Sequence, residues 1–512
     1  MIMVLAVLAA LALAAFTLWA QPAYAQAAPA APAAPVAAAA PAEAATPPVA
    51  EATAPAAEAA APAEIEKKID KGDVSWMLVS TLLVLLMILP GLALFYGGLV
   101  RTKNMLSMLM QVSTVTVIGM IAWALWGYSL SFTDGGGLNK FIGGTSKLFL
   151  QGVNYSTQVE TFSVGVMLPE LVFFVFQMTF ACITAALVLG GVAERMKFSG
   201  VVIFAILWPL LSYYPIAHMV WWWVGATSAV GQTAEQLAAG AGHLWALGAI
   251  DFAGGTVVHI NAGVAALVGA IILGPRTGYR QEPMAPHSLT LTFVGAGLLW
   301  VGWFGFNAGS NLEANGYAAL AMANTLLATA AAGLSWVLVE WVMRKRPTML
   351  GMASGIVAGL VAVTPAAGFA GPIGAIILGL VVSPICIVFC STIKNALKYD
   401  DSLDAFGIHA VGGIVGAIGT GIVVSPSLGG AGIVDFATCK AETLACGALE
   451  SYTIAGQTWI QTQAAITAVI WSAVASAIVF FLIKIIGQLR AAKEVEEDGL
   501  DISEHGERAY HP

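Results

Sequence analysis

Two histidines lie inside apolar stretches of the sequence, with no acidic or metal-binding side chain close by. His259 is in "GTVVHINAG" (Gly255–Gly263) and His409 is in "FGIHAVGG" (406–413). Ionisable groups inside apolar membrane segments are costly and usually face a partner or a transport pathway. Burial disfavours a charge on either imidazole, so a pair of them is expected to be mostly neutral, with one ring donating an N–H and the other accepting it. Such a pair suits a small neutral polar solute or proton transfer; the alternative is that each ring only bonds a neighbouring helix.

The sequences around these histidines resemble each other. "DFAGGTVVHINAGVAALVGA" (251–270) and "DAFGIHAVGGIVGAIGTG" (404–421) both begin with Asp, carry one His and continue with small residues. A second pair is "GLALFYGGLV" (91–100) and "GWFGFNAGSN" (302–311). Because the related segments are expected to run in opposite directions, they indicate an inverted repeat, which places a site at the membrane midplane. His259 and His409 are then expected to approach each other.

Asp251 and Asp404 precede the two histidines at the expected helix starts. A carboxylate at this position caps backbone N–H groups and matches the helix dipole. We therefore expect both residues to act as structural caps. An additional hypothesis is that Asp251 contributes negative potential at the outer entrance.

The composition requires a membrane setting for these elements. Of 512 residues, 59% are hydrophobic and 10% are charged, whereas soluble domains carry about a quarter charged residues. Apolar stretches long enough to span a bilayer recur eleven times, and in lipid they must be helices because every backbone group needs an internal partner. The predicted fold is an all-α polytopic membrane protein with two inverted five-helix repeats and an eleventh helix. The expected spans are 76–99, 108–131, 166–192, 199–220, 252–273, 288–308, 317–343, 349–364, 371–395, 406–424 and 462–486.

The basic residues favour one orientation of these spans. With the segment before the first span outside, only six of the 21 Lys and Arg residues remain outside: Lys67, Lys68, Lys71, Lys140, Lys147 and Lys440. This asymmetry predicts an inner-membrane protein with a periplasmic N-terminus and a cytoplasmic C-terminus. Residues 1–25 resemble a signal peptide ending in Ala23-Tyr24-Ala25, although an uncleaved first helix is the alternative. Residues 26–72 are an Ala/Pro-rich segment expected to be disordered, 73–486 form the transmembrane domain, and 487–512 form a tail.

Several function classes lack support in the sequence. It has no basic patch for nucleic acid, no P-loop and no nucleophile elbow. The five cysteines form no CxxC pair and no Cys/His cluster with metal spacing. We therefore expect no enzymatic activity, no cofactor and no metal site. Cys439 and Cys446 both fall in the expected outer loop between the last two spans, where an oxidising compartment could join them in a disulfide; two free thiols are the alternative.

The chain resembles the ammonium transporters of the ammonium transporter/Rh family. The resemblance covers about 73–510 and follows the family's order through all eleven spans. It is carried by "GLALFYGGLVRTKN" (91–104), "FACITAALVLGGVAER" (180–195), "PIAHMVW" (215–221), "DFAGGTVVHINAG" (251–263), "GWFGFNAGS" (302–310), "DDSLDAFGIHAVGGIVG" (400–416) and "EEDGLDISEHGERAY" (496–510).

The resemblance implies a trimer with one pore in each subunit and assigns roles to particular residues. An outer vestibule that recruits ammonium, or methylammonium as an analogue, would use Phe176, Phe180, Trp221 and Ser310. Phe180 and Phe306 would form a stacked gate above His259 and His409, and Trp303 would lie beside the lumen. Ammonium would lose its proton at the vestibule, ammonia would cross, and the proton could follow separately through the histidines.

Two alternatives use the same fold. One is an ammonium sensor, which the short segment after the last span disfavours because sensors of this fold usually carry a long output domain. The other is an Rh-type gas channel, which Trp221 disfavours. The tail resembles the family's regulatory C-terminal region, which contacts other subunits and helps a cytosolic PII-type protein to dock. Asp498, Gly499 and Asp501 carry this resemblance, with Gly499 expected to permit a bend; the alternative is a solvated acidic tail.

Overall fold

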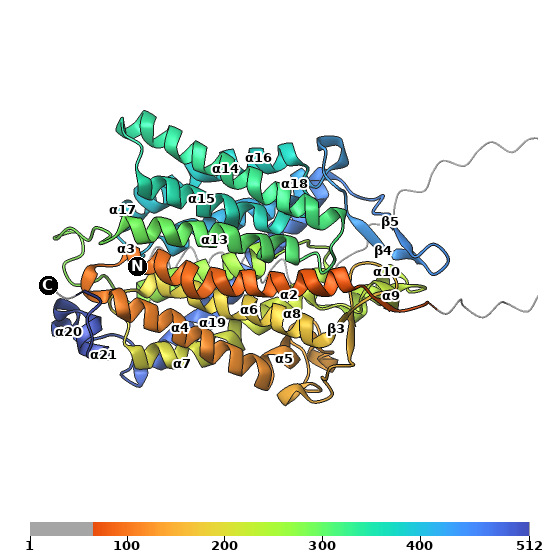
Figure 1. Ribbon diagram of the computed structural model, residues 1–512, viewed down its shortest axis with the longest axis horizontal. Coiled ribbons are helices and arrows are strands. Elements are labelled where there is room, and N and C mark those ends of the chain that lie inside the picture. The colour runs from red at the N-terminus through yellow and green to blue at the C-terminus, as the bar shows by residue number, and fades with distance from the viewer. Residues whose placement is uncertain (1–64, 511–512) are drawn as a thin grey trace, which may run out of the picture.

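The computed structural model describes residues 65–510 and contains, within that range, eleven helices long and apolar enough to cross a membrane. They lie roughly parallel to one another along the long axis of the molecule (Figure 1). The prediction of an all-α protein with eleven spans is therefore confirmed. The predicted signal peptide and most of the Ala/Pro-rich segment lie outside the described residues.

Most spans consist of several helical elements joined end to end. The first five spans are α2 (Lys71–Leu86), η1 (Met87–Leu92) and α3 (Ala93–Leu99); η2 (Thr102–Asn104), α4 (Met105–Ala122), η3 (Trp123–Gly127) and α5 (Tyr128–Phe132); α6 (Glu170–Val192); α7 (Phe198–Trp208), η6 (Pro209–Tyr213) and α8 (Tyr214–Trp221); and η7 (Gly255–Ile260) with α12 (Asn261–Leu273). The remaining six are α13 (Leu289–Gly309); α14 (Gly316–Arg344); α15 (Met349–Val363) and η8 (Thr364–Ala366); α16 (Pro372–Ile387), η9 (Val388–Ile393) and α17 (Lys394–Leu397); η10 (Phe406–Ala410) and α18 (Val411–Val423); and α19 (Ile454–Ile485).

Capping residues explain why some spans begin earlier than hydropathy predicts. The last span begins at Ile454 rather than at 462, because the Thr453 hydroxyl accepts the Gly456 N–H and starts a polar first turn. The first span begins at Lys71, where the Asp70 carboxylate accepts the N–H groups of Gly72 and Asp73. A side-chain cap satisfies the first backbone N–H groups of a helix. Each of these helices can therefore begin several residues before the apolar stretch.

The two histidine-bearing spans share an unusual local structure. Each begins with a π-helical segment, η7 or η10, that contains the histidine and passes directly into an α-helix. Glycines four residues after each histidine let the two spans approach closely. A Cβ at Gly263 would lie 2.7 Å from the Cβ of Ala410, and one at Gly413 would lie 3.0 Å from the carbonyl oxygen of Gly255. The matching positions of these features agree with the repeat read from the sequence.

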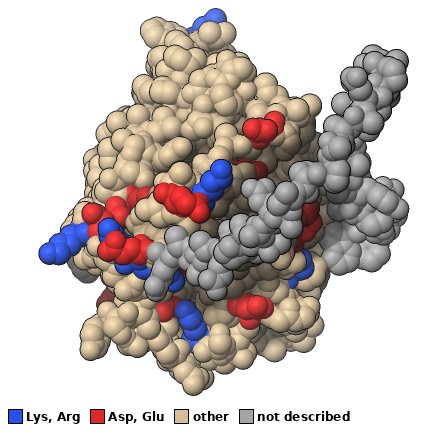
Figure 2. All heavy atoms as spheres, turned by 90° about the vertical axis from the view of Figure 1, so that its right-hand side faces the viewer, with Lys and Arg blue, Asp and Glu red and all other residues tan. Residues whose placement is uncertain are grey.

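The segments outside the spans gather at the two ends of the bundle. One end, here called the hairpin end, carries the sheet β1 (Lys68–Ile69), β3 (Val166–Pro169), β2 (Gln158–Glu160) in that order, with β1 parallel and β2 antiparallel to β3. It also carries the antiparallel hairpin β4 (Val434–Lys440) and β5 (Ala445–Ala448), and the short helices α9 (Ala226–Ala229), α10 (Ala234–Gly240) and α11 (His243–Ala246). The opposite end, the tail end, carries α20 (Lys493–Asp498) and α21 (Leu500–His505) (Figure 1). Figure 2 looks onto the hairpin end and shows Asp and Glu side chains around the middle of that face, interspersed with Lys and Arg.

Candidate functional site

A cavity of about 610 Å³ opens at the hairpin end. Its deeper part is lined by Trp221, at the end of α8, and by Ser310, directly after α13. The Ser310 hydroxyl donates to the Phe306 carbonyl oxygen at 2.7 Å. Because its one proton is used within the helix, the hydroxyl oxygen can accept a hydrogen bond from a cationic N–H.

Trp221 is held in place by the segment that leads into the fifth span. Its indole N–H donates to the Asp251 carbonyl oxygen at 2.9 Å. The Asp251 carboxylate in turn accepts four backbone N–H groups, from Gly254, Gly255, Thr256 and Val257, at 2.6–3.1 Å. Asp251 therefore caps the start of η7 and also fixes the ring that lines the cavity, while its own side chain is 8% exposed.

Two stacked phenylalanines lie next to Trp221. The ring centroids of Phe180 and Phe306 are 4.2 Å apart and the rings are tilted by 17°. Phe180 also meets Trp221 edge to face at 6.0 Å. Both phenylalanines are fully buried, so the pair separates the outer cavity from the interior of the bundle.

His259 and His409 lie on the interior side of this pair. The His259 ring is 6.0 Å from Phe306 and 5.3 Å from both Trp303 and His409, measured between ring centroids. The Nδ1 atoms of the two histidines are 3.3 Å apart. One of these nitrogens can donate to the other only if the two rings adopt different tautomers. Trp303 is fixed by its N–H, which donates to the Thr364 hydroxyl at 2.9 Å.

A second cavity, of about 220 Å³, lies beyond the histidine pair, toward the tail end. His409 lines it together with Tyr96, Ser402 and Asp404. The order along the bundle is therefore outer cavity, phenylalanine pair, histidine pair and inner cavity. Between the two cavities lie the buried rings of His259, His409 and Trp303.

The expectation that Asp404 caps the tenth span is wrong. Asp404 has a positive φ of 58° and its carboxylate pairs with Lys394 at 2.7 Å. Asp401 is the cap, accepting the N–H groups of Ala405 and Phe406 at 3.1 and 2.8 Å. The cap lies further upstream because the chain makes a left-handed turn at Asp404 before η10 begins. Burial raises the pKa of Asp401 to about 6.

On α6, the residues that line the outer cavity differ from those expected from the sequence. Phe176 and Phe180 are both fully buried, with their ring centroids 4.9 Å apart, and neither lines the outer cavity. Gln177 does line it, together with Phe173 one turn earlier on α6. Sequence reasoning missed Gln177, although a lone amide in an apolar span is a signal for a functional position.

The tail end contains a buried charge network that sequence reasoning also missed. Arg276 donates to Glu194 and to Asp400, each at 2.8 Å, and Arg101 donates to Glu194 at 3.0 Å. Burial alone would raise the pKa of Glu194, but the two arginines lower it to about 2. The network ties together the loops that follow the first, third, fifth and ninth spans.

The tail docks on this end through two of the three residues named from the sequence, Gly499 and Asp501. The Asp501 carboxylate accepts the N–H groups of Leu106 and Ser107, at 3.0 and 2.7 Å, at the start of α4. Gly499 separates α20 from α21 with a φ of 108°, and a Cβ there would lie 2.6 Å from the Lys103 carbonyl oxygen. Asp498 is exposed. In the hairpin at the other end, Cys439 and Cys446 are joined in a disulfide.

The chain matches the family model described as Ammonium Transporter Family over residues 75–510. A relative named "Ammonium transporter" from Aquifex aeolicus is 42% identical over 87% of this chain and 95% of its own length. Another of that name, from Bacillus subtilis, is 42% identical over 86% of this chain and 98% of its own length.

Solved structures with the same fold include one titled "Sensor Amt Protein". It superposes with a TM-score of 0.72 at 27% identity, covering 85% of this chain and 98% of that chain. Mep2 from Saccharomyces cerevisiae superposes with a TM-score of 0.69 at 31% identity, covering 83% and 91%.

Proposed function

The chain belongs to the ammonium transporter family and is a multi-pass membrane protein, and from this premise we propose that it conducts ammonia derived from ammonium across the membrane. The observation that carries the proposal is the unbroken order of outer cavity, Phe180–Phe306, His259–His409 and inner cavity. Each step of the proposed pathway takes place at one of these cavities or residue pairs.

Recruitment takes place in the outer cavity. The face of Trp221 attracts a small cation through its π electrons, and the Ser310 oxygen accepts one N–H from it. Gln177 adds a second acceptor, because its Oε1 atom is buried and has no hydrogen-bond partner within the described residues. These groups replace part of the water shell of ammonium. Phe180 forms the floor beneath the bound ion.

Deprotonation precedes passage through the phenylalanine pair. An ammonium ion in a narrow apolar section would cost several kcal/mol or more, whereas ammonia is neutral and small. Beyond the pair, ammonia hydrogen-bonds to the imidazoles. The released proton follows through the His259–His409 contact, which makes net transport electrogenic. K⁺ has no proton to lose and is excluded for that reason.

The setting of the pathway is part of the same proposal. The hairpin end faces the periplasm and the tail end the cytoplasm of a bacterial inner membrane, because most basic residues between the spans lie at the tail end. The family resemblance further suggests a homotrimer and a PII-type protein docking at the tail end, near α20 and α21. Cross-linking in native membranes and co-purification with the PII-type protein test these two assemblies.

A sensor is the second candidate function. The observation that favours it is the superposition with the structure titled "Sensor Amt Protein", whose TM-score is similar to that of Mep2. A sensor would bind ammonium in the outer cavity without passing an appreciable current. The two candidates therefore differ in turnover and share the recruitment step.

Electrical recording on membranes that contain the purified protein distinguishes the two candidates. Transport predicts a saturable inward current with ammonium, a smaller one with methylammonium and none with K⁺ at the same concentration. Binding of ammonium without current would support the sensor. An equal current with K⁺ would contradict the deprotonation step.

A further inference from the structure

The outer cavity is much larger than an ammonium ion requires, and one of its walls has no evident part in recruiting that ion. The wall belongs to the disulfide-bonded hairpin and the residue before it, with Ile433, Val434 and Phe436 lining the cavity. Phe436 of this wall packs against Trp223. The cavity therefore offers an extended apolar surface outside the place where ammonium binds.

Aromatic contacts hold Phe436 at this wall. Its ring lies 4.3 Å from Trp223, which is itself stacked on Trp245 at 5.3 Å and on Phe162 at 6.3 Å between ring centroids. All four aromatic residues line the cavity. Phe436 and Trp223 are only half-buried, so both rings keep surface that a ligand can contact.

The disulfide maintains this wall where the strand pairing is interrupted. The register of β4 and β5 is irregular between Asp435 and Lys440. Side chains bridge part of the gap: the Thr438 hydroxyl accepts the Gly447 N–H and donates to the Asp435 carbonyl oxygen. Cys439 is buried against Val164 and Ala226, so the disulfide fixes both strands to the body of the protein. A two-stranded hairpin alone is only marginally stable in water.

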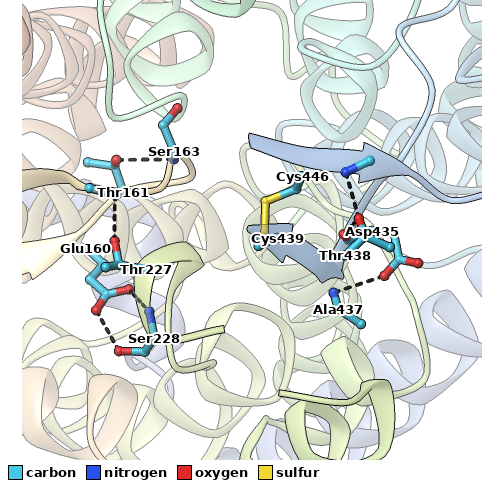
Figure 3. Close-up of a disulfide and its surroundings, with 12 residues drawn as sticks. Glu160, Thr161, Ser163, Thr227, Ser228, Asp435, Ala437, Thr438, Cys439 and Cys446 are labelled. Atoms are coloured by element: carbon cyan, nitrogen blue, oxygen red, sulfur yellow. Dashed lines mark hydrogen bonds between the residues drawn. A yellow bond between two sulfur atoms is a disulfide. The ribbon is translucent and has the colours of Figure 1, made fainter. Parts of the chain in front are cut away.

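The opposite side of the cavity carries carboxylates that accept hydrogen bonds from uncharged groups. Glu160 accepts from the Ser228 N–H and hydroxyl at 2.9 and 2.6 Å. Glu313 accepts from the Ser163 N–H and hydroxyl at 3.0 and 2.8 Å and from the Asn315 amide. Figure 3 shows Glu160 and Ser163 on the opposite side of the view from the hairpin. The cavity is therefore acidic on one side and apolar on the other.

We propose that the outer cavity binds organic ammonium ions with short alkyl chains, and that Phe436 and the hairpin form the surface that contacts the alkyl group. The charged nitrogen sits in the region that recruits ammonium, and the chain extends along the wall toward the mouth. Such ions compete with ammonium for entry. The inference rests on the proposed function in that both use the same cavity, but it concerns a wall that ammonium itself does not need.

A homologous series tests this directly. Methyl-, ethyl-, propyl- and butylammonium chloride are compared as inhibitors of the ammonium current at neutral pH. In the wild type we expect each added methylene to strengthen inhibition about two- to fourfold, as burial against an apolar wall predicts. Phe436→Ala should flatten this dependence on chain length, as should the double variant Cys439→Ser/Cys446→Ser. The KM for ammonium should change less than about twofold in both.

Leu444→Ala is the matched control, because Leu444 lies in the turn of the same hairpin, is exposed and does not line the cavity. It should keep the chain-length dependence. Phe436→Leu, which retains an apolar side chain, should give an intermediate slope and replaces Phe436→Ala if that variant does not fold. The proposal would be overturned if inhibition of the wild type did not depend on alkyl chain length. It would also be overturned if that dependence were unchanged in every Phe436 variant that folds.

Calorimetric titration with butylammonium chloride separates this proposal from the proposed function, because it needs no transport. Potassium chloride at equal ionic strength is the reference. Butylammonium binding that weakens in Phe436→Ala supports the wall even if no ammonium current is found. An ammonium current without such binding supports transport and rejects the wall.

Discussion

The Nδ1 atom of His259 lies 3.3 Å from the Nδ1 atom of His409, although 150 residues separate the two in the chain. Each histidine occupies the π-helical start of its span, and Gly263 and Gly413 allow the spans to come close enough for the rings to meet. The contact is thus a product of both halves of the fold. It links the phenylalanine pair, which His259 contacts, to the inner cavity, which His409 lines.

Replacing either histidine should interrupt proton transfer. In His259→Ala and in His409→Ala we expect the ammonium current to fall at least about tenfold, because loss of one ring removes a hydrogen-bond partner worth 1.4 kcal/mol or more in the barrier. His243→Ala, outside the spans, is the control and should conduct normally. A full current with unchanged exclusion of K⁺ in both pore variants would reject the relay.

Trp221→Leu should weaken recruitment more than turnover. Loss of a cation–π contact worth about 0.5–2 kcal/mol raises the KM for ammonium about two- to thirtyfold. The maximal current should fall less, since the histidine pair is intact. Current measured against ammonium concentration checks this, with Trp341→Leu, an exposed position at the far end of α14, as the control. An unchanged KM would remove Trp221 from the recruitment site.

Asp251, which caps its span as expected, and Asp401, which caps the tenth span, should matter more for stability than Asp404. Asp251→Ala leaves four buried N–H groups without their acceptor and Asp401→Ala leaves two, so each should cost about 2 kcal/mol or more. Asp404→Ala removes a half-exposed ion pair and should cost less. Thermal unfolding in detergent ranks the variants, and an equal loss in Asp404→Ala would contradict the assignment of Asp401.

The sequence predicted the number, order and approximate limits of the spans because long apolar stretches can satisfy their backbone groups in lipid only as helices. It also predicted that His259 and His409 lie close together, because the two residues occupy equivalent positions in an inverted repeat. It could not show that Asp401 rather than Asp404 caps η10, since that depends on a left-handed turn at a non-glycine residue. Nor did it show that Gln177 rather than Phe176 faces the cavity, because adjacent residues on one helix differ by about 100° in direction and only packing decides which one does.

The charge network at the tail end predicts a specific pH dependence. The pKa of Glu194 falls from 4.5 to about 2 on folding, so its stabilising contribution is complete above about pH 4.5 and is lost as the pH falls toward 2. Glu194→Gln should lower the melting temperature at neutral pH, by an amount that corresponds to about 3 kcal/mol for a broken buried pair. The difference between wild type and variant should shrink between pH 4.5 and 2. A difference that stays constant across that window would reject the ion pair.

The tail should loosen when its contacts with the start of α4 are removed. Asp501→Asn replaces one of two acceptor oxygens by a donor, so the N–H of Leu106 or Ser107 loses its partner, at a cost of about 1 kcal/mol. Gly499→Ala places a methyl group against Lys103 at a backbone conformation that alanine rarely adopts, and should have the larger effect. Hydrogen exchange of residues 493–505 and of the two α4 amides measures the loosening.

Asp498→Asn is the matched control for the tail, because Asp498 neighbours Gly499 yet is exposed. It should leave exchange unchanged, which distinguishes docking by particular contacts from a general effect of acidic charge. If Asp498→Asn and Asp501→Asn exchange alike and faster than wild type while Gly499→Ala does not, the tail is held by its net charge. If Asp501→Asn and Gly499→Ala loosen the tail and also change the ammonium current while Asp498→Asn does neither, docking at α4 is coupled to transport. The connection is short, because Arg101, which follows the first span and pairs with Glu194, lies directly before the segment that α21 contacts.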